Sequence, residues 1–289
     1  MTTTTTITVR LLDQQKADIF AGIFQHIKLF TDQINLIFEK ERLYIQSMDA
    51  CRISIFEVFL PSSWFDVYEH NVPTACTIGL NSTILYKILG TRDKGQEITI
   101  RFDSDNDDKL YLEFTSNDRA LYDKDFEMCL IDIDCELMAI PPSDSCAEFS
   151  IPSANFASII GQLKLFGDSL DIVCNESAIQ LTALSVESGK MAVKIEIDDL
   201  TEFSINEDAE ITMSFGLANL HNICAYSKIA KSMDVHLTEN FPMKIIYWLC
   251  PSVPSSDVSQ EGVGQEGTGP SRSSDAKLVF YLAPKINDD

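Results

Sequence analysis

The sequence predicts an α+β protein in which antiparallel sheet dominates and four helices interrupt it at regular intervals. Most of the 289 residues fall into short runs where apolar and polar residues alternate. Four segments have helical periodicity instead, and they start near residues 17, 82, 153 and 217. Each interval is long enough for one helix and several strands, so we expect a β-α-β-β-β unit repeated four times.

The alternating runs are typical of strands that bury one face. In the clearest of them, Met191, Val193 and Ile195 alternate with small or charged residues. Turn signals such as Ser188-Gly189 separate one run from the next. The other predicted strands are 51–60, 97–102, 110–114, 179–183, 235–237, 243–249 and 278–282.

The helical segments each carry a single apolar stripe, as helices do when they cover a sheet. The second one is the best delimited, because Asn81 is a capping residue at its start and Gly90 follows its last apolar residue. The predicted helical segments are 16–30, 82–92, 153–166 and 217–232.

Charge is distributed unevenly between the helices and the rest of the chain. The 22 Lys and Arg against 44 Asp and Glu give a net charge of −22, which excludes binding to nucleic acid through bulk charge. The helical segments nevertheless contain only one acid, Asp18. Singly, their basic residues could be ordinary surface lysines, but together they predict one face that accepts a polyanion. They are Lys16, Lys28, Lys87, Arg92, Lys164, Lys228 and Lys231.

Several other classes of protein and site are not indicated. No apolar stretch approaches the ~18 residues of a membrane span, and the N-terminus lacks the features of a secretory signal. The eight cysteines include no CxxC pair and the four histidines are scattered, so we expect reduced core thiols, no metal site and no cofactor. These features favour a cytosolic or nuclear protein.

Five stretches together carry a specific resemblance. They are Ile45-Gln-Ser-Met-Asp49, the run from Asn81 to Leu89, Asp125-Phe-Glu-Met128 leading into Ile131-Asp-Ile-Asp134, Ile140-Pro141, and Tyr281-Leu-Ala-Pro-Lys-Ile286. In residues, order and separation they resemble the proliferating cell nuclear antigen family, the eukaryotic-type DNA sliding clamps. The resemblance runs, with gaps, from about residue 7 to the C-terminus.

The resemblance implies a two-domain DNA-clamp fold that forms a ring-shaped homotrimer. Each domain would hold two β-α-β-β-β units, with sheets outside and helices lining a central hole. Domain one would be 1–129, the interdomain connector 130–146 and domain two 147–289. The segment 251–275, rich in Ser, Gly and Pro, is predicted to be a disordered insertion in domain two.

The resemblance also implies a binding platform and no enzymatic activity. Such a clamp encircles duplex DNA without sequence preference and tethers DNA polymerase, a clamp loader and other replication or repair proteins that carry short clamp-binding peptides. It would act in the nucleus, or in a viral replication compartment. A subunit of a heterotrimeric clamp and a monomeric viral-type processivity factor are the alternatives. Catalysis is disfavoured because there is no Gly-rich phosphate loop and the carboxylates are scattered.

Only part of the family's basic pattern is present on the helices. Lys28 and Lys87 match basic family positions, whereas Ser158 and Gly161 stand where the third helix of the family carries arginines. On the fourth helix the basic family positions fall on alanines. The resulting DNA-binding prediction is Lys28, Lys87, Arg92, Lys164, Lys228 and Lys231.

The resemblance further implies a hydrophobic pocket beneath the connector that accepts a short helical turn with aromatic anchors. Periodicity alone would place Ile53 and Ile55 in a core strand. The predicted partner-binding residues are Met48, Ile53, Ile55, Met138, Ile140, Pro242, Tyr281, Ala283 and Pro284.

The resemblance implies subunit contacts between the strand edges at 121–130 and 187–195, and open sheet edges in a ring must indeed be paired. The predicted interface residues are Leu121, Tyr122, Met128, Met191 and Val193. Glu176 replaces the lysine that is modified in the family, so attachment at that position is not expected.

Overall fold

The structure, a computed structural model, describes residues 6–104, 108–134, 136–249 and 275–285. Four successive β-α-β-β-β units follow one another along the chain, so the predicted fourfold order is confirmed. The first unit is β1 (Thr6–Leu11), α1 (Gln14–Ile27), β2 (Gln33–Phe38), β3 (Arg42–Met48) and β4 (Ser54–Pro61). The second is β6 (Cys76–Asn81), α2 (Ser82–Leu89), β7 (Glu97–Asp103), β8 (Lys109–Thr115) and β9 (Lys124–Cys129).

The second half of the chain repeats this order. The third unit is β10 (Ala147–Pro152), α3 (Ser153–Leu163), β11 (Ser169–Cys174), β12 (Ala178–Ser185) and β13 (Gly189–Glu196). The fourth is β15 (Ile211–Gly216), α4 (Leu217–Ile223), β16 (Ser232–Leu237), β17 (Met243–Trp248) and β18 (Lys277–Leu282). Between units lie short elements that the sequence did not predict: η1 (Ser62–Trp64), β5 (Val67–His70), η3 (Ile197–Asp199) and β14 (Glu202–Ile205).

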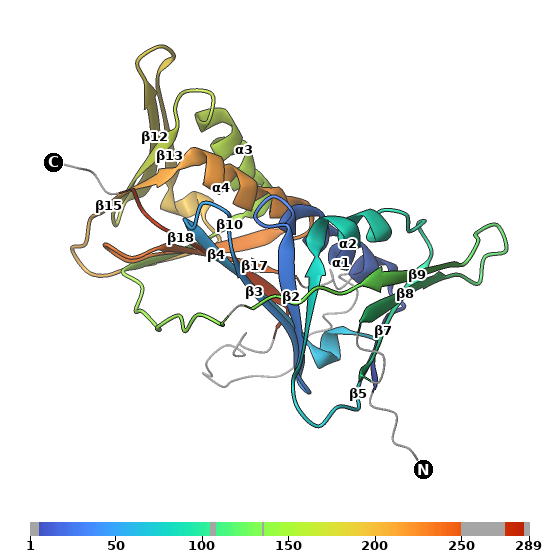
Figure 1. Cartoon of the computed structure of the whole chain (residues 1–289). Coiled ribbons are helices and arrows are strands. Elements are labelled where there is room, and N and C mark those ends of the chain that lie inside the picture. Colours follow the sequence, from blue (N-terminus) through green and yellow to red (C-terminus); the bar gives the residue numbers. More distant parts are fainter. Residues whose placement is uncertain (1–5, 105–107, 135, 250–274, 286–289) are drawn as a thin grey trace, which may run out of the picture.

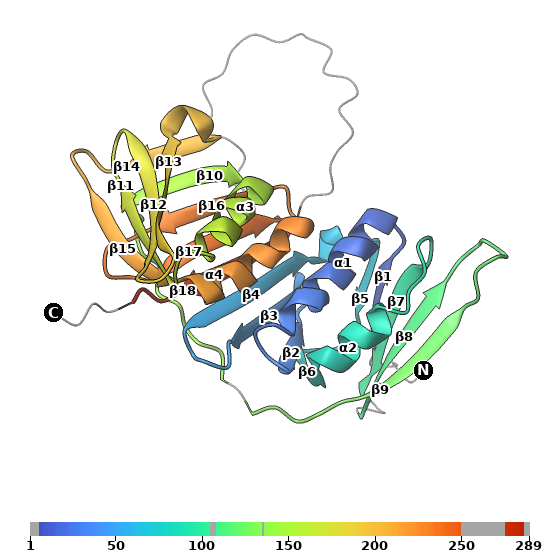
Figure 2. The same cartoon turned by 90° about the horizontal axis from the view of Figure 1, so that it is seen from above.

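The strands form three antiparallel sheets, and the largest one joins the two halves. Its order is β14-β10-β16-β17-β18-β4-β3-β2-β6, with β18 of the second half paired to β4 of the first. The smaller sheets have the orders β5-β1-β7-β8-β9 and β13-β12-β11-β15. β9 and β13 are therefore edge strands, and they lie at opposite ends of the molecule (Figures 1 and 2).

All four helices lie on one side of the central sheet, as Figure 2 shows from above. α1 packs against α2, α3 packs against α4, and a 3-10 segment after α4, η4 (Cys224–Lys228), contacts both α1 and α3. α1 and the segment after η4 approach so closely that a Cβ on Gly22 would lie 2.5 Å from Ile229 Cγ2. The helices thus form one layer that runs across both halves.

All four helices end earlier than predicted, by three residues for α1, α2 and α3 and by nine for α4. α1 ends at Ile27 because Leu29 and Phe30 donate their N–H groups to carbonyls three residues back, which turns the chain toward β2. The predicted helix 217–232 is wrong beyond Ile223, where the chain tightens into η4 and then enters β16. The Lys231 carbonyl accepts the Ser153 N–H at 2.9 Å, so this stretch is already bonded to the third unit.

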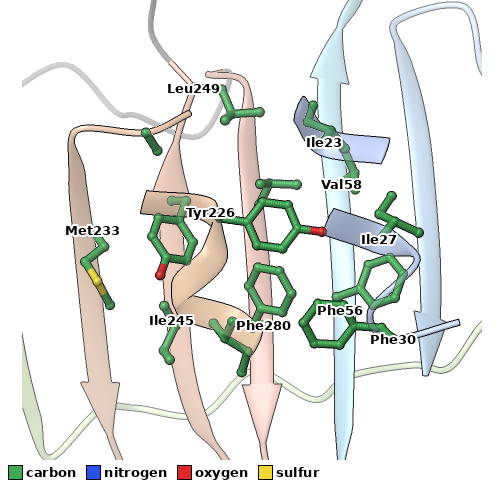
Figure 3. Packing of buried hydrophobic residues seen from close by; sticks show 14 of the residues in the cluster. Ile23, Ile27, Phe30, Phe56, Val58, Tyr226, Met233, Ile245, Leu249 and Phe280 are labelled. Atoms are coloured by element: carbon green, nitrogen blue, oxygen red, sulfur yellow. The ribbon is translucent and has the colours of Figure 1, made fainter. Parts of the chain in front are cut away.

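The core beneath the helices is continuous between the halves. Phe30, which follows α1, packs against Phe56 of β4 and Phe280 of β18, with ring centroids 5.7 and 5.5 Å apart (Figure 3). Tyr226 of η4 packs against Phe280 at 5.0 Å and lies 6.3 Å from Phe30. Burial of these four rings from both halves stabilises a single packed unit.

The six described cysteines are free, and Cys174 and Cys224 are buried in the core. Burial raises the pKa of the Cys174 thiol to about 11 and that of Cys224 to about 12, so both are protonated hydrophobic side chains at neutral pH. The predicted insertion 251–275 lies, except for Asp275, outside the described residues. No helix in the described ranges is long and apolar enough to span a membrane. Nor do those ranges bring three or more His, Cys, Asp or Glu side chains together as metal ligands.

Candidate nucleic-acid and partner interfaces

The helix layer presents most of the predicted DNA-binding lysines to solvent. Lys87 of α2, Lys164 at the end of α3, and Lys228 and Lys231 after α4 are all exposed. Lys28, at the end of α1, is half-buried, and its Nζ lies 3.8 Å from the centre of the Tyr86 ring. Positive charge is thus arranged along the helix side of both halves, as the sequence predicts.

Arg92 differs from the other predicted DNA-binding residues. Its side chain is only 5% exposed and forms an ion pair with Asp18 of α1. The guanidinium also donates to Gln14 Oε1 at 3.0 Å and to the Gln96 carbonyl at 2.9 Å. These contacts tie α1 to the turn after α2, so Arg92 would have to leave them to reach a phosphate.

A hollow on the helix side brings in a lysine that the sequence analysis missed. It has a volume of about 500 Å³ and lies between α1 and η4, with Lys94, Lys228 and Lys231 around it. Its one acidic residue, Asp18, is the carboxylate already paired with Arg92. Lys94 lies just beyond the predicted helical segment 82–92, so counting charge only within helices passed over it.

His26 of α1 is buried in the same region, at 5% exposure, against the edge of the Tyr226 ring. Burial, followed by the nearby ammonium groups of Lys228 and Lys28, lowers the pKa of His26 to about 4. The imidazole is therefore neutral at physiological pH and adds no positive charge to the helix layer.

The connector has no helix or strand in its described part, and hydrogen bonds from three strands hold it (Figure 1). Ile131 N–H donates to the Gly79 carbonyl at 2.9 Å, and Asn35 Nδ2 donates to the Ile133 carbonyl at 3.3 Å. Further along, the buried side chain of Gln46 bonds both the N–H and the carbonyl of Met138. The connector thus crosses the face of the central sheet opposite the helices.

A pocket of about 340 Å³ opens between the connector and this sheet. One row of residues that face each other across four neighbouring strands forms its floor: His236, Lys244, Tyr281 and Ile55. The connector segment from Met138 to Pro141 forms one wall. Phe241, 48% exposed, and Pro242 form another wall from the β16–β17 turn.

The structure brings together part of the predicted partner-binding set. Ile55, Met138, Ile140, Pro242 and Tyr281 line the pocket. The remaining four lie near it but do not line it: Met48 faces Ile55 from β3, Ile53 lies in the β3–β4 turn, and Ala283 and Pro284 follow β18.

Eight lining residues are absent from the predicted partner-binding set: Ala139, Pro141, Ser143, Ser145, His236, Thr238, Phe241 and Lys244. Phe241 directly precedes Pro242, and Lys244 follows it by two positions on the same face. Extending the alternation forward from Pro242 would have identified Lys244, whereas Phe241, one position back, does not fit the alternation.

A buried carboxylate organises the sheet beside the pocket floor. Glu57 accepts hydrogen bonds from Tyr44 Oη at 2.5 Å, Gln46 Nε2 at 3.3 Å and Tyr281 Oη at 3.3 Å. Burial, and then Glu57, raises the pKa of both tyrosines, so they stay protonated as donors. Tyr281 is thus held in a fixed position in the pocket floor.

The motif residue Asp49 has a structural role beside this region. Its Oδ1 accepts the backbone N–H groups of Ile53 and Ser54 at 2.8 and 2.7 Å, which closes the β3–β4 turn. Its Oδ2 accepts a bond from Asn219 of α4 at 3.4 Å. This carboxylate therefore connects the first half to the fourth helix.

The predicted interface residues lie at the two sheet edges or beside them. Met191 and Val193 are on β13 and are half-buried against the core, while Tyr122 precedes β9 and is 83% exposed. Leu121, also before β9, is half-buried. Met128, on β9, is only 3% exposed, so its side chain belongs to the core of the subunit and only its backbone is at the edge.

The comparisons with known proteins agree with this architecture. The sequence model of the proliferating cell nuclear antigen N-terminal domain matches residues 11–137, and that of the C-terminal domain matches residues 139–253. The chain is 25% identical over 248 residues to proliferating cell nuclear antigen 2 of Drosophila melanogaster, an alignment that covers 85% of this chain and 86% of that protein.

Fold and matches together define the class of non-enzymatic DNA sliding clamps. Because the matched residues span most of its length, the chain belongs to the proliferating cell nuclear antigen family. Membership confirms the predicted fold class and the expectation of a non-catalytic protein. It supports a general role as a processivity factor in DNA replication and repair, with DNA and replication proteins as partners. A nuclear location and a homotrimer are typical of the family.

Proposed function

We propose that three copies of this chain form a ring that encircles duplex DNA and tethers DNA polymerase and other replication or repair proteins in the nucleus. In this proposal the two clamp domains are 1–129 and 147–289, and 130–146 is the connector between them. A clamp loader would place the ring on DNA. Short peptides of the partners would dock in the pocket beneath the connector.

One observation carries this proposal: the lysine-bearing helix layer lies between two free sheet edges at opposite ends of the chain (Figure 2). A subunit with different edges at its two ends associates head to tail, and such association closes into a ring when the rotation permits. Pairing the edges also removes the exposed backbone N–H and C=O groups that favour aggregation. The helix layer would then face the enclosed space.

The side chains of the two edges are complementary in charge. On β9 the exposed residues Asp125 and Glu127 alternate with residues turned to the core. On β13 the charged exposed residues are Lys190, Lys194 and Glu196. Within the subunit Lys194 pairs with Glu196, and Glu127 of β9 pairs with Lys109 of β8, so contacts between copies would replace these two ion pairs. Opposite charges favour β9 of one copy against β13 of the next and disfavour contacts between two β9 edges.

Sliding requires attraction to DNA that is weak and independent of sequence. Lysines on the helix layer attract phosphates through counterion release without reading bases. The acidic remainder of the surface repels DNA, which restricts contact to the helix side. A polymerase held to such a ring rebinds at high effective concentration after each release, and this raises processivity.

Solution mass tests the ring directly. The proposal expects about three times the 32.3 kDa chain mass in light scattering after gel filtration. The charge-reversed double variant D125K/E127K should dissociate, and so should K190E/K194E. A variant that carries all four substitutions should recover the trimer. A wild-type mass of one chain would overturn the ring and support the monomeric alternative; trimer formation only with a second kind of clamp chain would support the heterotrimeric one.

Neutralising the helix face tests the DNA contact. The variant K28Q/K87Q/K228Q/K231Q should keep its trimer mass and its folding but lower the processivity of a clamp-dependent polymerase. Its DNA affinity should also depend less steeply on salt. Unchanged processivity in a folded trimer would contradict the assignment of these lysines.

A further inference from the structure

We propose that Lys244 makes the connector pocket selective for partner peptides that carry a carboxylate beside their apolar anchor. This inference rests on the proposed docking function of the pocket and adds the chemistry of the preferred partner. The relevant geometry is the position of one ammonium group in the floor of an otherwise largely apolar pocket.

Lys244 lies in the centre of the pocket floor. On β17 it faces Tyr281 of β18 on one side and His236 of β16 on the other. All three line the pocket, together with Ile55 in the next strand. A peptide that reaches Ile55, at the apolar end of the floor, therefore passes directly beside the lysine.

No acid of the described residues neutralises this lysine. The ion pairs of the described chain do not include Lys244. Three acids of the surrounding strands are engaged with other groups. Asp234 of β16 accepts bonds from Ser150 Oγ and Trp248 Nε1, each at 2.6 Å. Glu148 lies 2.9 Å from His236 Nδ1, and Glu57 accepts bonds from Tyr44, Gln46 and Tyr281.

The positive charge of Lys244 also acts on a neighbour. Lys277 lies on the same face of β18, four positions before Tyr281, and its pKa is lowered first by burial and then by Lys244. The ammonium of Lys244 thus acts on the outer face of the central sheet, in a chain whose net charge is −22.

The sign of the selectivity follows from desolvation. A neutral peptide that covers Lys244 removes water from the ammonium without providing a carboxylate to pair with it, and this costs free energy. A peptide with Asp or Glu at that place replaces the lost water with a charge-assisted hydrogen bond. A lysine or arginine at the same place adds repulsion between like charges. The pocket should therefore bind peptides with an acidic residue beside the anchor most tightly. Peptides with a neutral residue there should bind less tightly, and those with a basic residue least tightly.

Fluorescence anisotropy with three short synthetic peptides tests this ranking. Each peptide presents the same two aromatic anchors on one helical turn, with Asp, Asn or Lys at the adjacent position. The wild-type ring should bind the Asp peptide about 5- to 10-fold more tightly than the Asn peptide, and added salt should reduce this ratio. K244A should bind both with similar affinity, and K244E should prefer the Lys peptide.

The variant K40A is a matched control, because Lys40 is exposed in the β2–β3 turn, away from the pocket. It should keep the wild-type ranking. Equal affinity of the wild type for the Asp and Asn peptides would overturn the inference while leaving the docking function intact. Absence of binding for all three peptides would overturn the docking function and the inference together. Unchanged thermal unfolding of K244A and K244E establishes that altered ranking does not reflect misfolding.

Discussion

Gln46 of β3 and Met138 of the connector are joined by a pair of hydrogen bonds between a side-chain amide and a backbone. Gln46 Nε2 donates to the Met138 carbonyl at 2.9 Å, and Met138 N–H donates to Gln46 Oε1 at 2.7 Å. The same Gln46 amide donates to Glu57, so the connector, the sheet and the carboxylate that holds Tyr281 form one network. Hydrogen bonds to the central sheet thus hold the connector wall of the partner pocket in place.

The first prediction concerns this bridge. Gln46→Ala removes the bond to Glu57 and the two bonds that hold the connector at Met138, and each of these two is worth about 1 kcal/mol. A local loss of about 2 kcal/mol corresponds to roughly 30-fold faster hydrogen exchange at the Met138 amide. Peptide affinity for the pocket should fall as well, because the wall must then be ordered on binding.

Gln180→Ala is the matched control, since Gln180 is an exposed glutamine on strand β12. It should leave exchange at Met138 and peptide affinity unchanged. Hydrogen exchange followed by mass spectrometry gives the readout. If Q46A left Met138 as protected as in the wild type, other contacts would be holding the connector.

The second prediction concerns the first residues of the connector. Ile131 crosses β6 so closely that a Cβ on Gly79 would lie 2.2 Å from its carbonyl oxygen. Gly79→Ala should therefore displace the connector and cost about 1–3 kcal/mol of unfolding free energy. Gly161→Ala, in α3, is the opposite case: nothing lies within 4 Å of the added Cβ, and the helix should gain about 0.5–1 kcal/mol. Denaturant unfolding compares the two; equal effects would mean that the connector moves aside without cost.

The sequence predicted the repeated units because each unit has a local signal. Alternation identifies β13, where Met191 and Val193 turn inward, and Asn81 caps α2 by accepting the Ile84 N–H at 3.0 Å. Such signals depend on residues only a few positions apart. The end of the fourth helix was missed because its cause is distant: the chain after Ile223 is set by bonds to Ser153.

The sites show the same division between local and distant causes. The exposed lysines within the four helical segments were identified, because an exposed charge on an amphipathic helix needs no partner. Lys94, just outside the second segment, was missed. Arg92 was predicted to bind DNA, but it bonds Asp18, which is 74 positions away in the sequence. No local sequence pattern predicts a pairing over that separation. Lys244 lies between Tyr281 and His236 in the pocket floor. This register follows from the pairing of three strands, which the sequence does not show.

The third prediction concerns pH. The pKa of His26 is about 4 in the folded chain against 6.5 when unfolded. As pH falls below 6.5 the unfolded chain takes up a proton that the folded chain does not, so stability decreases until about pH 4 and then no longer changes through this group. The full contribution is at most roughly 3 kcal/mol.

His26→Gln removes this titration and should flatten the loss of stability between pH 6.5 and 4 relative to the wild type. Denaturant unfolding at equal protein concentration, at several pH values, measures the difference. Replacement of the exposed His221 by Gln is the comparison. Desolvation and then Lys164 lower the pKa of His221 as well, but its imidazole is not enclosed by the core, so H221Q should flatten the pH profile less than H26Q does. Parallel pH profiles for the wild type and H26Q would show that His26 is not the group responsible.

The fourth prediction restores positive charge to α3. Ser158 is exposed, Gly161 has open space at its Cβ position, and Lys164 follows three residues later on the same side of the helix. The variant S158R/G161R should bind a short duplex more tightly at low salt. Its affinity should fall more steeply with salt, by up to about 1.8 in the logarithmic slope, because each new phosphate contact releases counterions.

A control variant separates position from net charge. S204R/Q180R adds the same two charges at exposed strand positions, on β14 and β12. If the helix layer is the DNA-facing side, this control should leave both the affinity and the salt slope close to those of the wild type. An equal gain in the two variants would mean that DNA responds to the overall charge of the chain, and the assignment of the helix layer to DNA would then be wrong.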